Sequence, residues 1–221
     1  KKIRKMMDNI KKENIDGIVE LVPTYCSLLI NYDVLKVDYQ SLVEKLKTLL
    51  NDDNETVEDE EVTLIEIPTL YNDECGPDLS YVAEYNKLSK EEVIKIHTGT
   101  DYLVYMLGFM PGFTYLGGMS EKIATPRLES PRLQIYPGSV GIAGKQTGMY
   151  PSMSPGGWRI IGRTPLKLYN PDSETPVYIS SGDYIRYVSI SEEEYNNILK
   201  KVENNEYKLN ICKVKRGELN A

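Results

Sequence analysis

The first seventy residues alternate between helical and strand-like patterns of apolar positions. Apolar residues at i, i+3, i+4 and i+7 predict an amphipathic helix over 2–13, and a similar stripe predicts a second helix over 39–50. Two short β-rich runs lie between these helices, at 17–22 and 27–32, and the Pro-containing gap that separates them favours a hairpin. A further strand is predicted at 62–67.

These elements follow the order α-β-β-α-β. A ferredoxin-like unit has the order β-α-β-β-α-β, so the pattern differs from it by one strand at the front. We therefore expect the natural chain to begin upstream of Lys1. On this pattern residues 1–68 form a small ferredoxin-like N-terminal domain that ends near Pro68.

The composition and the pattern of predicted elements change after residue 70. Two short helices are predicted within 71–97, and a last helix is predicted over 192–202; Ser and Glu at capping-box spacing introduce the second and the last of these. Twelve of the 16 glycines and seven of the 12 prolines lie between Gly99 and Pro165, among short β-rich runs that indicate a sandwich or barrel. The predicted strands are 102–107, 134–136, 139–143, 159–162, 166–169, 177–180 and 184–188.

Composition removes several classes of function. The net charge of −7 disfavours nucleic-acid binding, and no apolar run approaches the ~18 residues of a membrane span. Three scattered cysteines and a single histidine give neither a disulfide framework nor a zinc site, so a reducing cytoplasm is expected. The nucleotide fingerprints GxxxxGK[ST] and GxGxxG are missing, as is the GxSxG turn of many hydrolases.

One segment is basic inside this acidic chain. Between Lys122 and Arg163 it contains six cations and one acid, Glu129. Such a run is either a solvated surface or a pocket for a carboxylate or phosphate, because the planar Arg fork matches both groups. Gly-rich turns between the cations would let backbone N–H groups approach the same anion. The six cations are Lys122, Arg127, Arg132, Lys145, Arg159 and Arg163.

The only histidine, His97, lies at the end of a predicted helix. Its position fits a structural cap that meets the negative end of the helix dipole. It also fits a proton carrier, because imidazole titrates near neutral pH.

Long blocks of the chain resemble the family of 5-oxoprolinase B subunits, which also includes KipI-type kinase inhibitors and allophanate hydrolase subunit 1. Tyr136 stands where relatives often carry Val, and Lys145 stands where Arg is common. The blocks are GIVELVPTYCSLLINYD, CGPDLSYVAEY, YLVYMLGFMPGFTYLGG, TPRLESPRLQIYPGSVGIAGKQTGMYP and SPGGWRIIGRTP.

The resemblance implies an α+β protein, with the ferredoxin-like domain followed over 69–221 by a cyclophilin-like β-barrel domain, its short helices and a C-terminal helix. It implies the B component of an ATP-dependent complex that converts 5-oxo-L-proline to L-glutamate with A and C subunits, inactive when alone. ATP would be used by the complex, and no metal or biotin is expected on this chain. The alternatives are an inhibitor that binds a sensor histidine kinase, and a carboxyltransferase half of urea or allophanate metabolism.

The substrate that the resemblance implies carries a carboxylate and a lactam. The catalytic residues expected to act on this substrate are His97, Lys145 and Gln146. The backbone near Gly138–Gly141 would hold the amide or an oxyanion. Arg132, Lys145, Arg159 and Arg163 are expected to line one pocket. The expected substrate- or anion-binding residues are Arg132, Gly138, Ser139, Arg159, Arg163 and Thr164.

Overall fold

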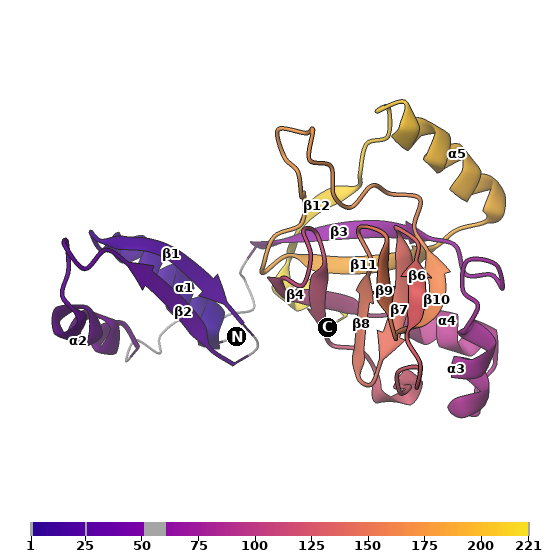
Figure 1. The fold of residues 1–221 in the computed structure, drawn as a ribbon, viewed down its shortest axis with the longest axis horizontal. Coiled ribbons are helices and arrows are strands. Elements are labelled where there is room, and N and C mark those ends of the chain that lie inside the picture. The colour runs from indigo at the N-terminus through magenta and orange to yellow at the C-terminus, as the bar shows by residue number, and fades with distance from the viewer. Residues whose placement is uncertain (1, 25, 51–60, 221) are drawn as a thin grey trace. The chain divides into compact units, whose positions relative to one another are not determined.

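A computed structural model describes residues 2–24, 26–50 and 61–220. The chain separates into two compact units, residues 1–59 and 60–221 (Figure 1). Both contain helices and strands, which confirms the mixed α+β class. No helix in the described ranges has the length and apolarity needed to cross a bilayer. The acidic stretch at 51–60 lies outside the described residues.

The first unit is a β-hairpin with two helices. Its strands pair antiparallel, with Pro23 opposite Leu28 at the closed end, as the hairpin prediction required. The Asp38 side chain accepts a hydrogen bond from the Ser41 N–H at 3.0 Å and so caps the second helix. The small core contains Ile15, Val37 and Leu42 with four partly buried neighbours. The elements are α1 (Lys2–Glu13), β1 (Ile18–Pro23), β2 (Leu28–Tyr32) and α2 (Tyr39–Leu50).

The strand β3 (Glu61–Thr69) belongs to the second unit. It runs parallel to β11 (Tyr184–Ser189) and antiparallel to β12 (Ile211–Lys215) in a five-stranded sheet of order β12-β3-β11-β4-β5. Both faces of β3 are buried, as in strands with neighbours on either side and layers above and below. The predicted boundary at residue 68 is therefore wrong by one strand, because apolar periodicity identifies a strand without identifying the sheet in which it pairs.

The rest of the second unit consists of two smaller sheets and several helices. A three-stranded sheet has the order β10-β7-β8, and β6 and β9 form a two-stranded ribbon. None of these sheets closes into a barrel over residues 61–220. The remaining elements are α3 (Leu79–Tyr85), α4 (Lys90–Thr98), β4 (Asp101–Leu107), β5 (Thr114–Gly117), η2 (Glu121–Ile123), β6 (Arg132–Ile135), β7 (Ser139–Ala143), β8 (Gln146–Met149), β9 (Ser154–Gly156), β10 (Arg159–Arg163), α5 (Glu192–Glu203) and η3 (Arg216–Glu218).

The main core of the second unit brings residues of the five- and three-stranded sheets into one apolar cluster. Ile65 and Ile185 come from the larger sheet, and Val140 and Ile161 from the smaller. An isolated bridge between Leu70 and Arg163 also links the end of β3 to β10. In Figure 1, α3 and α4 lie on one side of this unit's strands and α5 on the other.

The structure differs from two predicted strands, 166–169 and 177–180, which have no regular secondary structure. Leu166, Leu168 and Ile179 in these segments are nevertheless buried in the main core. Alternating apolar positions therefore mark core contacts made by an irregular chain that follows Pro165 and Pro176, where a ladder of hydrogen bonds is not formed. Both predicted capping boxes are present, at the starts of α4 and α5.

Candidate functional site

Asp78 is the centre of the charged cluster that the basic segment forms. It directly precedes α3, and its backbone N–H donates to the Ile160 carbonyl at 2.9 Å. Its Oδ2 accepts the Ile160 N–H at 2.7 Å, so main chain and side chain together fix Asp78 to β10. The residue is only 5% exposed. A carboxylate buried to this extent requires charged or hydrogen-bonding partners.

Two arginines of the basic segment supply those partners. Arg132 on β6 places Nη1 at 2.9 Å and Nη2 at 3.0 Å from the two Asp78 oxygens, which is a two-pronged ion pair. Arg159 on β10 places Nη1 at 3.7 Å from Asp78 Oδ1. The Arg159 guanidinium also lies 3.7 Å from the ring centre of Tyr81 on α3, and its Nε donates to the Pro126 carbonyl at 3.3 Å. The structure therefore brings together two of the predicted anion-binding residues.

Lys145 and Gln146 lie at the tight turn between β7 and β8. Lys145 is exposed and pairs with Glu121 at 2.5 Å, while Gln146 is half-buried at the first position of β8. Gly144, which precedes Lys145, has φ of +58°, a conformation that glycine adopts easily. The ion pair of Lys145 is with η2 rather than with Asp78.

Arg163 is held in a third place, at the end of β10. Its guanidinium lies 5.1 Å from the ring centre of Tyr136, and its backbone exchanges hydrogen bonds with Leu70. Its buried Nε has no hydrogen-bond partner among the described residues. The four cations predicted to share one pocket are thus divided among Asp78, Glu121 and Tyr136. Two acids outside the counted segment, Asp78 and Glu121, pair with three of the four, so the groups that balance these cations come from elsewhere in the chain.

The predicted residues Gly138, Ser139 and Thr164 meet at the turn before β7. Gly138 has φ of +80°, and a Cβ there would lie 2.3 Å from the Thr164 carbonyl oxygen. The Thr164 N–H donates to the Gly138 carbonyl at 2.9 Å, while Ser139 and Thr164 are almost fully buried. The Gly138 N–H donates to the Tyr150 carbonyl and the Ser139 N–H to the Tyr136 carbonyl, so the main-chain bonds that the structure gives this turn are made within the fold.

His97 is fully buried at the end of α4, in a chain of hydrogen bonds. Its Nδ1 lies 2.8 Å from Tyr71 Oη and its Nε2 lies 2.8 Å from Thr147 Oγ1. Because the Thr147 hydroxyl donates to the Gly141 carbonyl at 3.1 Å, it accepts from His97 Nε2–H, which leaves Nδ1 to accept the Tyr71 proton. This order of partners defines one neutral tautomer.

The surroundings of His97 keep it neutral. The rings of Tyr102 and Tyr187 pack against the imidazole, with centroids 5.5 and 4.4 Å away. Burial lowers the pKa of His97 to about 3, because the charged form loses its hydration. Burial also raises the pKa of the Tyr71 hydroxyl well above its usual value. The predicted catalytic histidine is therefore shielded from solvent, and its hydrogen bonds go to Tyr71 and Thr147.

Asp78 and Tyr81 are two residues of the cluster that the sequence pattern did not identify. Both lie in the CGPDLSYVAEY block that carried part of the resemblance, so a signal was present. A count of charges restricted to 122–163 could not include a partner 54 positions before Arg132. No group of three or more metal-binding side chains is found in the described ranges.

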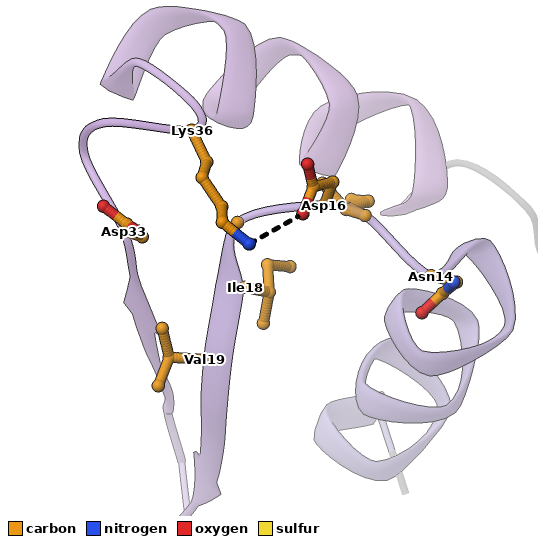
Figure 2. Close-up of a pocket in the computed structure, with 8 residues that line it drawn as sticks. Asn14, Asp16, Ile18, Val19, Asp33 and Lys36 are labelled. Atoms are coloured by element: carbon orange, nitrogen blue, oxygen red, sulfur yellow. Dashed lines mark hydrogen bonds and ion pairs between the residues drawn. The ribbon is translucent and has the colours of Figure 1, made fainter.

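A separate hollow of about 400 Å³ lies in the first unit, between the α1–β1 and β2–α2 connections (Figure 2). Lys36 reaches across it to Asp16 at 3.4 Å. Asp33 on its wall accepts the Leu35 N–H at 2.9 Å. The charged groups of this hollow are thus bonded within the unit, and it contains none of the predicted site residues.

Similarity to known proteins defines the family of the chain. The family model for the carboxyltransferase domain, subdomain C and D, matches residues 1–179. The B subunit of 5-oxoprolinase from Bacillus subtilis is 46% identical over 196 residues, which span 85% of this chain and 82% of that protein. The corresponding 5-oxoprolinase protein of Haemophilus influenzae is 41% identical over 77% of this chain and 79% of that protein.

Solved structures agree with this placement. A conserved uncharacterized protein from Pyrococcus horikoshii is 51% identical and matches with a TM-score of 0.58 over 87% of this chain and 88% of that one. The Kluyveromyces lactis urea carboxylase, at 18% identity, has the same fold with a TM-score of 0.74 over 96% of this chain and 21% of its own. The matches define a carboxyltransferase-type domain of the C and D class. Within that class, the chain belongs to the family of 5-oxoprolinase B subunits.

Proposed function

We propose that this chain is the B component of an ATP-dependent complex that hydrolyses 5-oxo-L-proline to L-glutamate together with A and C subunits. The observation that carries the proposal is the 46% identity to the 5-oxoprolinase protein of B. subtilis, over 82% of its length. Because the 221 residues contain no nucleotide fingerprint, ATP is expected to be handled by another component of the complex.

Within this function, Arg132 and Arg159 are proposed to receive the substrate carboxylate. Lys145 and Gln146, at the β7–β8 turn, are proposed to act near the lactam. We assign His97 a core role, since both ring nitrogens are bonded inside the fold. The ferredoxin-like and cyclophilin-like arrangement and a cytoplasmic location remain finer expectations of the same proposal.

The test is co-expression with the A and C subunits, followed by an assay of ATP hydrolysis with and without 5-oxoproline. The assembled complex should hydrolyse ATP in a 5-oxoproline-dependent way and release glutamate. The purified single chain should show no such activity. A complex that forms and hydrolyses no 5-oxoproline would contradict the assignment.

A carboxyltransferase role is the second candidate. The family model and the Saccharomyces cerevisiae urea amidolyase, 26% identical over 96% of this chain and 13% of that protein, favour it. Transfer of a carboxyl group from carboxybiotin to urea by the assembled complex would select this role. Inhibition of a sensor histidine kinase is the remaining alternative, and an autophosphorylation assay with the purified chain tests it.

A further inference from the structure

We infer that Asp78 is a positioning residue that makes Arg132 and Arg159 a receptor for a single carboxylate group. The identity of the substrate rests on the proposed function, whereas the arrangement of the binding groups rests on the geometry of the Asp78 cluster. The cluster consists of Asp78, Tyr81, Arg132 and Arg159.

Asp78 is held rigidly against β10. Asp78 exchanges two hydrogen bonds with Ile160, through its own N–H and through Oδ2. A carboxylate fixed in this way holds its oxygens at constant positions on β10. Arg132, which grips both oxygens, is therefore oriented by the main chain of a neighbouring strand.

The cluster carries an excess of positive charge. The cluster contains two guanidinium groups and one carboxylate, so it retains one positive charge. Arg132 has 32% of its side chain exposed, which leaves part of the side chain in contact with solvent. One further carboxylate would bring the cluster to two cations and two anions, whereas a phosphate dianion would exceed this balance.

Arg132 has more hydrogen-bond donors than Asp78 uses. Arginine has five N–H groups, and Asp78 takes one from each terminal nitrogen of Arg132. A third goes to the Trp158 carbonyl at 3.5 Å. The donors that remain on Arg132 can bind a second carboxylate without breaking the pair with Asp78.

An exposed aromatic surface lies beside the cations. Tyr81 stacks on Tyr85 with ring centroids 6.1 Å apart, and both rings are exposed on α3. Arg159 lies directly over Tyr81. This flat aromatic surface beside the cations suits a carboxylate attached to a small ring rather than a free inorganic anion.

The test measures binding to the full-length chain by calorimetry, with 5-oxo-L-proline, its neutral carboxamide and inorganic phosphate as probes. We expect the carboxylate to bind and the carboxamide and phosphate to bind at least about tenfold more weakly. No carboxylate binding, or equal binding of all three probes, would overturn the inference.

Substitution separates positioning from charge alone. Asp78→Asn raises the net charge of the cluster, so a purely electrostatic site would bind the carboxylate more tightly. Positioning predicts the opposite, about tenfold weaker binding, because the amide cannot accept both Arg132 donors. Arg132→Lys keeps the charge and loses the fork, and it should weaken binding by a similar factor.

Two controls keep the result interpretable. Lys213→Gln removes a cation on β12 that donates to Thr63, so binding should stay as in the wild type. Circular dichroism shows whether Asp78→Asn folds, and Arg132→Lys decides the question if it does not. Wild-type binding in Arg132→Lys would overturn the inference while leaving the 5-oxoprolinase assignment intact. In the assembled enzyme, Arg132→Lys should raise KM more than it lowers kcat, which a loss of folding would not produce.

Discussion

Asp78 and His97 are both buried polar side chains that join a helical segment to strands of the second unit. His97 lies in a neutral hydrogen-bond chain from Tyr71 to the Gly141 carbonyl, with every member bonded inside the core. Asp78 lies in a charged cluster with one excess cation and a partly exposed arginine. A buried polar group with satisfied neutral partners stabilises the fold, whereas we propose that one that leaves charge and donors at the surface binds a ligand.

The largest effect on stability is expected when the neutral chain of hydrogen bonds through His97 is broken. His97→Ala removes both hydrogen bonds and leaves a cavity, so the free energy of unfolding should fall by about 4 kcal/mol. Tyr71→Phe removes one of the two bonds and should cost about 1–2 kcal/mol. Urea denaturation of both variants measures the difference. If the free energy of unfolding falls by less than about 1 kcal/mol in His97→Ala, a structural role for this histidine is contradicted.

The pH dependence of stability gives a second measure of the same chain of hydrogen bonds. The pKa of His97 is about 3 in the folded protein, below its ordinary value of 6.5. The unfolded chain therefore binds more protons between these values, and stability is full above pH 6.5 and falls as pH decreases towards 3. Between about pH 7 and pH 5 the loss should be about 2 kcal/mol.

Because His97 is the only histidine, its replacement isolates this contribution. Urea denaturation at about pH 7 and about pH 5 should show the loss in the wild type and its absence in His97→Gln. An equal loss in both proteins would assign the pH dependence to carboxylates instead.

The charged cluster should act on catalysis as well as on folding, because the buried Asp78 carboxylate loses its main partner when Arg132 is removed. In the assembled complex, Arg132→Ala should lower kcat/KM for 5-oxoproline by about tenfold, through loss of charge-assisted hydrogen bonds. Arg163→Ala should have a smaller effect, because Arg163 stacks on Tyr136 outside the cluster. Steady-state kinetics of the two variants compares them directly, and a larger loss in Arg163→Ala would relocate the anion site.

The sequence predicted local elements such as helices and turns better than it predicted which strands pair and which side chains meet. The helices α1, α2, α4 and α5 follow from apolar spacing and caps, which are local properties. The pairing of β3 with β11 joins strands far apart in the chain, such as Leu64 with Tyr184, and no local pattern contains that information. The same limit applies to Asp78, whose role depends on two arginines that only the folded chain brings near it.

The smallest effect on stability is expected at Lys145, which tests whether an exposed ion pair resembles the buried cluster. Lys145 and Glu121 have 69% and 74% of their side chains exposed, so solvent and salt screen their attraction. Lys145→Gln should change the free energy of unfolding by less than about 0.5 kcal/mol, measured by urea denaturation. Lys145 can therefore take part in the reaction without contributing much to the stability of the fold. A fall in kcat of the assembled complex, at unchanged stability, would support Lys145 as a catalytic residue. Unchanged kcat and KM would leave the lysine as a solvated surface charge and confine the functional cations to the Asp78 cluster.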